Sequence, residues 1–252
     1  TALIGVAAAG YTRDNGFVCV TKNTEAERLR TEELPNNFTI ISYEWHEQSL
    51  DTAVAMHTPT ASAADFDLPD AKQIEGSRLR RPLAESDIQP YRELSHEVAT
   101  AIERVTKEIN PGDTEQEVAA ALEAIHAERG IRTPVILVGG RDRLSMYQHV
   151  TPTTATIDSC VMISVTAERN GRHVSATRTV AFEESALRWL REYHTMAMRI
   201  EVTALDATRE AARGDGTAAD VFDAISEAYT ALDKPEEWRH HHQGGATGFV
   251  TQ

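Results

Sequence analysis

Residues 161–179 read VMISVTAERNGRHVSATRT, and this stretch decides the fold. Its first part, residues 161–165, is short, apolar and rich in β-branched side chains, as is typical of a strand. The dipeptide Asn170-Gly171 that follows is characteristic of a two-residue hairpin turn. Residues 173–182 then form the expected return strand. The stretch therefore predicts an antiparallel β-hairpin.

Helices are predicted on both sides of this hairpin. Apolar residues recur at steps of three and four through residues 86–109, which is the pattern of an amphipathic helix. Thr114 and Glu117 have the spacing of a capping box, so a second helix begins there and ends at Gly130. The other expected elements are a strand at 134–138, a polar segment that ends at His149, helices at 184–213 and 217–232, and a His- and Gly-rich segment at 238–249.

The first part of the chain predicts a small α/β domain, because strand-like and helix-like segments alternate there. The expected strands are 17–20 and 38–43, and the expected helices are 25–33 and 45–56. Residues 58–85 are rich in prolines, small residues and charges, and are typical of a connection. We expect two domains, 1–82 and 83–252.

Composition excludes several classes of protein. The 252 residues include 25 Lys and Arg against 39 Asp and Glu, a net charge of −14, which disfavours nucleic-acid and acidic-membrane partners. No stretch is apolar enough to span a bilayer, and no signal peptide is visible. Cys19 and Cys160 form no disulfide framework. We expect a cytoplasmic protein, and because the chain starts at Thr1, we expect residues to precede it.

From about residue 83 to 249 the order of elements resembles the pita-bread fold of creatinase and the Xaa-Pro and methionine aminopeptidases, the M24-like peptidase superfamily. Residues 111–115 resemble the P-G-x-(T/S)-E opening of the family, and 140–152 resemble its G-x-N...H-x-x-P segment. The hairpin with 177–179 resembles G-Y-x-x-D-x-T-R-T, and 241–248 resemble H-x-x-x-H-x-x-G.

This resemblance implies the fold class α+β, with a pita-bread C-terminal domain preceded by a small, creatinase-like α/β N-terminal domain. Members of the family have further strands after the last of these segments. The domain at 83–252 is therefore expected to be incomplete at its C-terminal end, and the two Glu ligands of the family would follow Gln252. Creatinase-like members are homodimers, so a homodimer is expected here.

Departures from the family pattern decide the expected chemistry. Peptidases of this fold bind two metal ions through two Asp, one His and two Glu. Aligned on the hairpin, this chain has Ser164, Ser175 and Gly245 at three of the five positions. A hydroxyl group or a hydrogen atom cannot replace a carboxylate or an imidazole as a ligand. We expect no metal and no cofactor.

Two histidines match the family where the metal ligands do not. His149 corresponds to the non-metal His that transfers protons in creatinase, and an imidazole that titrates near pH 6.5 suits that task. His241 corresponds to a second non-metal His, which contacts substrate or its developing charge. Alternatively, His149 and His241 could each have a purely structural role. If His241 lies on a strand, its neighbours His240 and His242 face away from it.

Several other residues are candidates for substrate binding: Tyr147, Ser164, Ser175, Thr177, Arg178 and His242. Arg178 could bind a carboxylate or form a structural ion pair. Tyr147 could face the pocket or be a buried strand aromatic. Creatinase has a Glu where this chain has Thr177, so creatine itself is not the expected substrate.

The leading hypothesis is a metal-independent, creatinase-like hydrolase that cleaves an amide-type or amidine-type C–N bond of a small molecule or short peptide-like substrate. His149 and His241 would be its catalytic residues. One alternative is a catalytically inactive peptidase-like protein that binds a peptide or another protein, because fold does not fix function. The other is a biosynthetic lyase or isomerase on the same scaffold.

Overall fold

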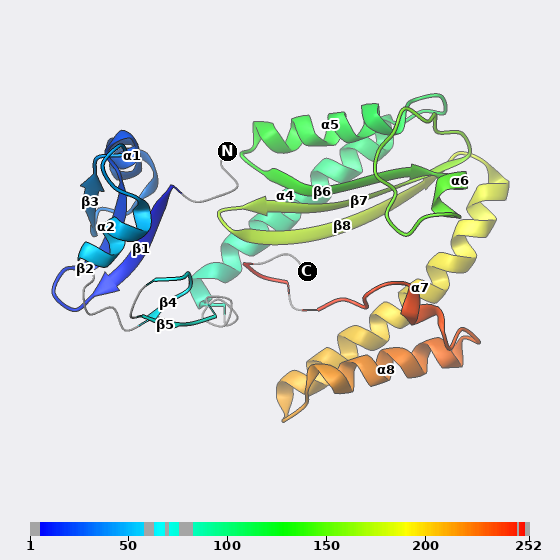
Figure 1. Cartoon of the computed structure of the whole chain (residues 1–252). Coiled ribbons are helices and arrows are strands. Elements are labelled where there is room, and N and C mark those ends of the chain that lie inside the picture. Colours follow the sequence, from blue (N-terminus) through cyan, green and yellow to red (C-terminus); the bar gives the residue numbers. More distant parts are fainter. Residues whose placement is uncertain (1–5, 58–62, 69–70, 76–82, 246, 250–252) are drawn as a thin grey trace. The chain divides into compact units, whose positions relative to one another are not determined.

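The computed structural model describes residues 6–57, 63–68, 71–75, 83–245 and 247–249 (Figure 1). The chain divides into two compact units, Thr1–Leu79 and Arg80–Gln252. Each unit has a hydrophobic cluster of its own. No helix in the described part of the chain is both long enough and apolar enough to cross a bilayer.

The first unit is built on a three-stranded sheet. Strand β1 (Ala7–Thr12) runs antiparallel to β2 (Gly16–Lys22), which runs parallel to β3 (Phe38–Tyr43). Helix α1 (Asn23–Arg28) continues into a π-helical turn (Leu29–Glu33) and connects the two parallel strands. Helix α2 (Leu50–His57) and the two-residue strands β4 (Ala63–Ala64) and β5 (Lys72–Gln73) complete the unit.

Local sequence explains two differences from the expected elements of this unit. Strand β1 consists largely of alanine and glycine, which carry little strand preference, so it was not predicted. The helix expected from residue 45 begins at Leu50 instead. Ser49 precedes it, and its hydroxyl oxygen accepts a 3.3 Å hydrogen bond from the backbone N–H of Thr52, as an N-cap residue does.

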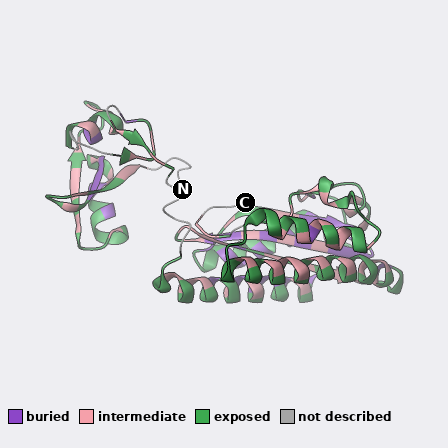
Figure 2. Cartoon of the chain, turned by 90° about the horizontal axis from the view of Figure 1, so that it is seen from below, coloured by how far each residue is buried: buried purple, intermediate pink, exposed green. Residues whose placement is uncertain are grey.

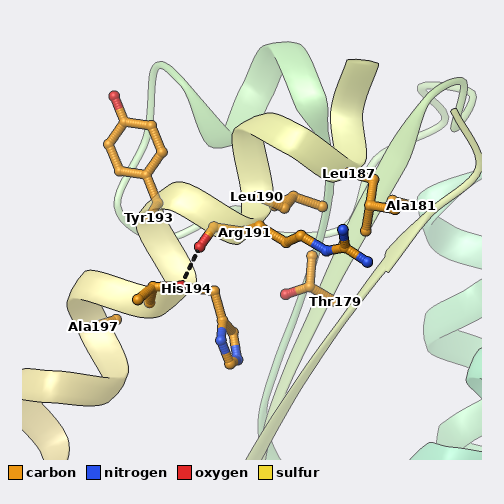
Figure 3. A pocket seen from close by; sticks show the side chains of 9 residues that line it. Thr179, Ala181, Leu187, Leu190, Arg191, Tyr193, His194 and Ala197 are labelled. Carbon is orange, nitrogen blue, oxygen red and sulfur yellow. Dashed lines mark hydrogen bonds between the residues drawn. The ribbon is translucent and has the colours of Figure 1, made fainter. Parts of the chain in front are cut away.

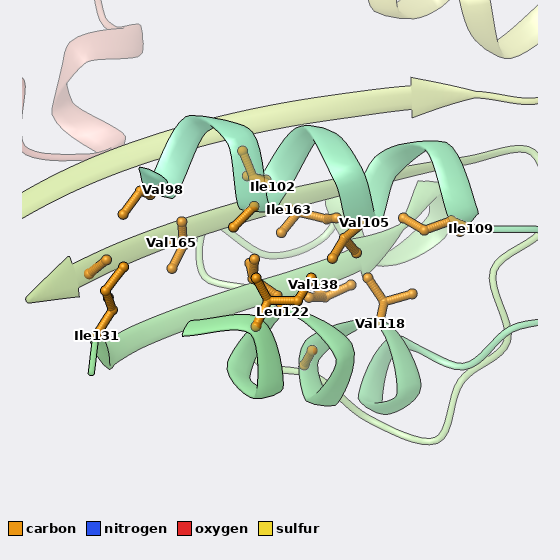
Figure 4. Packing of buried hydrophobic residues seen from close by; sticks show 14 of the residues in the cluster. Val98, Ile102, Val105, Ile109, Val118, Leu122, Ile131, Val138, Ile163 and Val165 are labelled. Atoms are coloured by element: carbon orange, nitrogen blue, oxygen red, sulfur yellow. The ribbon is translucent and has the colours of Figure 1, made fainter. Parts of the chain in front are cut away.

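The second unit is an antiparallel sheet covered on one face by two helices. The strand order is β6 (Arg132–Gly140), β7 (Cys160–Arg169), β8 (Arg172–Ala181). Helices α4 (Glu85–Glu108) and α5 (Glu115–Glu128) pack on the sheet through a shared apolar cluster (Figure 4). Buried members of this cluster include Leu94, Ile102, Leu122, Val138, Ile163 and Val165.

Two local signals in this unit act as the sequence predicts. At the hairpin, Asn170 and Gly171 have φ angles of 53° and 77°, the positive values that a type I′ turn requires. At the start of α5, the backbone N–H of Glu117 donates to the Thr114 hydroxyl at 3.2 Å. The Glu117 carboxylate accepts from the Thr114 N–H at 2.8 Å. This reciprocal capping box fixes where α5 begins.

The chain then leaves the sheet through two further helices. Helix α7 (Glu184–Arg213) packs against α8 (Ala218–Ala231), and a 3₁₀ turn (Glu237–His240) follows. Burial is concentrated in the sheet with α4 and α5, while α7 and α8 are mostly exposed or partly exposed (Figure 2). Exposed apolar side chains on α7 include Tyr193, Met198, Val202 and Leu205.

Candidate active site

Two histidines that lie 92 residues apart meet in the second unit. The Nε2 atoms of His149 and His241 are 3.1 Å apart, and their ring centroids are 4.9 Å apart. His149 follows the short helix α6 (Arg141–Leu144), and His241 follows the 3₁₀ turn. His149 is exposed and His241 is partly exposed, so solvent and small molecules reach the pair.

The contact of Nδ1 of His241 determines which ring donates the hydrogen bond between His149 and His241. Nδ1 of His241 lies 2.6 Å from the backbone carbonyl oxygen of His242. A carbonyl oxygen can only accept, so Nδ1 carries the proton, and Nε2 of neutral His241 has a free lone pair. The bond between the rings is then donated by Nε2–H of His149. Nδ1 of His149 remains as the basic nitrogen of the neutral pair.

The backbone beside His149 is anchored to the sheet. Its neighbour Val150 is fully buried, and the Val150 carbonyl accepts a 2.9 Å hydrogen bond from the N–H of Val138. Gly139 makes room for this contact, because a Cβ there would lie 2.7 Å from Cβ of Val150. Gly139 pairs with Met162, so Val150 packs on the sheet face opposite α4 and α5.

A buried carboxylate ties together the two ends of the segment that carries His149. Glu115 is 1% exposed, and it accepts hydrogen bonds from the N–H of Gly140 at 3.0 Å and the N–H of Thr153 at 3.0 Å. It also accepts from the Thr153 hydroxyl at 2.7 Å and from Arg143. Glu115 was not predicted as a site residue, although a carboxylate at the start of an apolar helix and beside a capping box was a usable signal.

The turn that carries His241 is braced from α8. The Tyr229 hydroxyl donates to the Gln243 side-chain oxygen at 3.0 Å. The Gln243 side-chain nitrogen donates to the carbonyls of Trp238 at 3.0 Å and His241 at 2.7 Å. These bonds hold the backbone on both sides of the histidine run.

The arrangement of the histidine run differs from the expected alternation. The rings of His241 and His242 lie against each other, with centroids 4.2 Å apart and planes inclined by 34°. The expectation that His242 faces away from His241 is therefore wrong. Its premise was a regular strand, whereas residues 241–245 follow a 3₁₀ turn and form no strand.

Hydroxyl groups occupy the exposed face of the hairpin. The Thr177 hydroxyl donates to the Ser164 oxygen at 2.9 Å, and the hydroxyls of Thr166 and Ser175 are also 2.9 Å apart. Each couple consists of cross-strand partners, so all four side chains point to the same face. This is also the face on which Val150 packs.

Arg178 and Tyr147 have other neighbours than these hydroxyls. Arg178 follows Thr177 on β8 and so points to the opposite face, where its Nη2 is 3.1 Å from a carboxylate oxygen of Glu103 on α4. Of the two roles expected for Arg178, this contact corresponds to the structural ion pair. Tyr147 is 54% exposed and lies near the Arg143 guanidinium, so the alternative of a buried strand aromatic is wrong.

Two cavities open beside β8, the edge strand of this sheet. The larger, about 870 Å³, lies between α4 and α7 and is lined by Ser175, Thr177 and Arg178 together with His194 and Glu201 from α7. The smaller, about 370 Å³, lies where Thr179 and Ala181 face α7, and Arg191 extends toward this strand (Figure 3). Neither His149 nor His241 is among the described residues that line them. His194 had no motif around it and was missed.

The family model for metallopeptidase family M24 matches residues 90–248. The chain belongs to this family. Membership in M24 supports a hydrolase-type function and agrees with the α+β, pita-bread fold. In the comparison with curated proteins, none matches.

Solved structures of M24-type peptidases share the fold at low identity. A Xaa-Pro dipeptidase from Bacillus anthracis has a TM-score of 0.68 at 15% identity, over 93% of this chain and 70% of that one. A prolidase from Pyrococcus furiosus has a TM-score of 0.68 at 16% identity, over 92% of this chain and 71% of that one. An X-Pro aminopeptidase from Thermotoga maritima has a TM-score of 0.66 at 15% identity, over 88% of this chain and 67% of that one.

The residues of this M24 chain do not fit the dinuclear metal centre that the family implies. Ser164 and Ser175 are neutral hydroxyls, and both are engaged in the cross-strand hydrogen bonds described above. Gly245 has no side chain. Among the residues that the structure describes, no group of three His, Cys, Asp or Glu is placed to hold a metal ion.

Proposed function

We propose that this M24 chain is a metal-independent, creatinase-like hydrolase that cleaves an amide-type or amidine-type C–N bond of a small molecule. The observation that supports the proposal is the 3.1 Å contact between the Nε2 atoms of His149 and His241. On this proposal the two histidines act as an acid–base pair, and hydroxyls of the hairpin occupy the positions of the family's metal ligands.

The tautomers of the pair assign a role to each imidazole. Nδ1 of His149 accepts a proton from water as the water oxygen bonds to the carbon of the C–N bond. The charge on the resulting imidazolium is stabilised by the lone pair of His241 Nε2, which accepts the Nε2–H of His149. His149 then returns its proton to the departing nitrogen as the C–N bond breaks. Acid–base catalysis of this kind contributes about 10²–10⁴-fold in rate.

The test is turnover of a panel of small amides, amidines and dipeptides by chelator-treated protein, followed as amine or ammonia release. His149→Ala should lower kcat by about 10²–10⁴-fold, while chelators leave the wild type unchanged. His240→Ala is the matched control, because His240 is exposed and adjacent to the pair. Turnover that requires two tightly bound metal ions, measured by elemental analysis, would contradict the proposal.

The cavity beside β8 favours one alternative, a protein that binds an extended peptide. β8 is the edge of its sheet, and the described residues cover this edge at its start, where the His173 N–H donates to the Gly248 carbonyl at 3.0 Å. An extended peptide can add to such an edge through main-chain hydrogen bonds. Thr177→Pro would then abolish peptide binding, measured by fluorescence anisotropy, while His149→Ala would leave it intact.

A further inference from the structure

The two imidazole nitrogens are spaced like two ligands of one metal ion. In a tetrahedral zinc site with Zn–N bonds of about 2.0–2.1 Å, two ligand nitrogens are about 3.3 Å apart. The Nε2 atoms of His149 and His241 are 3.1 Å apart. A shift of a few tenths of an ångström would open the pair to the separation that such an ion needs.

His241 also has the outer contact that metal-bound histidines characteristically show. A ligating imidazole usually donates its other N–H to a carbonyl or carboxylate, which fixes the tautomer and aims the lone pair. In this structure Nδ1 of His241 is 2.6 Å from the His242 carbonyl oxygen, and Nε2 points at His149. The tautomer that carries the lone pair on Nε2 is therefore set before any ion binds, and the ion replaces the Nε2–H of His149 as the partner of that lone pair.

Both ligands are supported by groups that resist displacement. The bonds of Gln243 to the carbonyls of Trp238 and His241 hold one imidazole. The burial of Val150, next to His149, holds the other. A site whose ligands are held in advance loses less conformational freedom when it binds.

We infer that His149 and His241 together chelate one divalent transition-metal ion, with water in its remaining coordination positions. Imidazole ligands suit Zn²⁺, Ni²⁺ and Cu²⁺, whereas Mg²⁺, Ca²⁺ and Mn²⁺ prefer oxygen, so the site takes the first group. It uses no residue at the ligand positions that Ser164, Ser175 and Gly245 occupy. With two protein ligands it is an exchangeable site, weaker than a four-ligand structural zinc site.

Ion binding and proton transfer compete for the same nitrogens. When both imidazoles are neutral, the His149 proton moves from Nε2 to Nδ1 as the ion binds, so no net proton is released. The basic Nδ1 lone pair is then lost. Reversible inhibition by Zn²⁺ or Cu²⁺ follows, and this consequence rests on the proposed hydrolase function.

The test is Cu²⁺ binding to the full chain without substrate, followed by electron paramagnetic resonance. The expected result is one equivalent of Cu²⁺ with hyperfine coupling to two imidazole nitrogens. His149→Gln and His241→Gln should each weaken this binding at least about tenfold, which is the smallest loss seen on removing even an outer-shell partner. His240→Gln, which alters an exposed neighbouring histidine, should bind Cu²⁺ like the wild type.

Circular dichroism spectra that match the wild type would establish that the variants are folded. Unchanged Cu²⁺ affinity in either folded ligand variant, or a spectrum with a single nitrogen, would overturn the inference. Because the readout needs no turnover, an inactive protein that binds Cu²⁺ through both histidines would contradict only the hydrolase proposal. An active protein that fails to bind Cu²⁺ would contradict only the chelate.

Discussion

The Thr153 hydroxyl donates a 2.7 Å hydrogen bond to the buried carboxylate of Glu115, which lies 38 residues earlier in the chain. The same carboxylate accepts from Gly140, at the other end of the segment that carries His149. A single side chain on α5 therefore closes this segment into a loop on the sheet. The position of His149 depends on it.

Replacing this carboxylate should destabilise the protein. Glu115→Ala leaves the Arg143 guanidinium and two backbone N–H groups without their acceptor, and loss of one partner of a buried ion pair costs about 3 kcal/mol. Urea unfolding would measure the change. Glu123→Ala, at an exposed position of the same helix, should stay within about 0.5 kcal/mol of the wild type. Equal effects of the two substitutions would contradict the structural role of Glu115.

Adding one methyl group beneath the His149 segment should have a large effect. In Gly139→Ala the new Cβ would lie 2.7 Å from Val150, so Val150 and the adjacent His149 must move. Overpacking of this kind costs about 1–3 kcal/mol. In Gly140→Ala the nearest atom is 3.8 Å away, so that neighbouring variant is the control and should be nearly neutral. Thermal unfolding that ranks the two variants in the opposite order would refute this packing.

Removing the Tyr229 hydroxyl should loosen the His241 turn. Tyr229→Phe leaves the Gln243 side-chain oxygen without this donor, and loss of one hydrogen bond costs about 1 kcal/mol. We also expect weaker Cu²⁺ binding, because the His241 backbone is less well held. Tyr193→Phe on exposed α7 is the matched control. If both variants bind Cu²⁺ like the wild type, the brace does not position His241.

Stability should fall at mildly acidic pH because of His126. This side chain is fully buried, with Nδ1 2.9 Å from the Thr133 hydroxyl, and Nε2 has no hydrogen-bond partner among the described residues. Burial lowers the pKa of His126. The unfolded chain takes up the proton near pH 6.5, so the unfolded state binds more protons below that pH. The contribution of His126 to the free energy of unfolding is therefore fully present above about pH 6.5 and is lost as the pH falls toward the lower, folded-state pKa.

Urea unfolding between pH 7.5 and 5.5 would measure this loss. In His126→Gln the part of the pH dependence that comes from His126 should disappear. The same slope in the variant and the wild type would show that His126 is not its source.

The second unit was largely predictable because its signals are local. The capping box of Thr114 and Glu117 and the Asn170-Gly171 turn each fix their backbone within a few residues, whatever packs on them. Strand β1 and the late start of α2 were not predictable in this way. The alanines of β1 depend on pairing with β2, and the start of α2 depends on the cap at Ser49.

The sequence predicted which histidines belong to the candidate site, but it did not predict the contacts that they make. The motifs around His149 and His241 point to both residues, but their 3.1 Å contact depends on how residues 92 positions apart are folded. The contact between the rings of His241 and His242 was not expected, because the prediction of alternating faces assumed a regular strand. Glu115 supports the site through four hydrogen bonds to residues at least 25 positions away. Its place beside the capping box could have marked it as important, but the local sequence does not reveal these partners.

The protonation state of the imidazole pair tests the central claim most directly. Nitrogen-15 NMR of the histidine rings near pH 8 should show His241 protonated at Nδ1 with a free Nε2, and His149 protonated at Nε2. In His149→Gln the His241 Nε2 signal should shift, because its hydrogen-bond donor changes. If His241 carries its proton on Nε2, or if its spectrum is the same with and without His149, the shared hydrogen bond does not exist and the proposed acid–base pair fails.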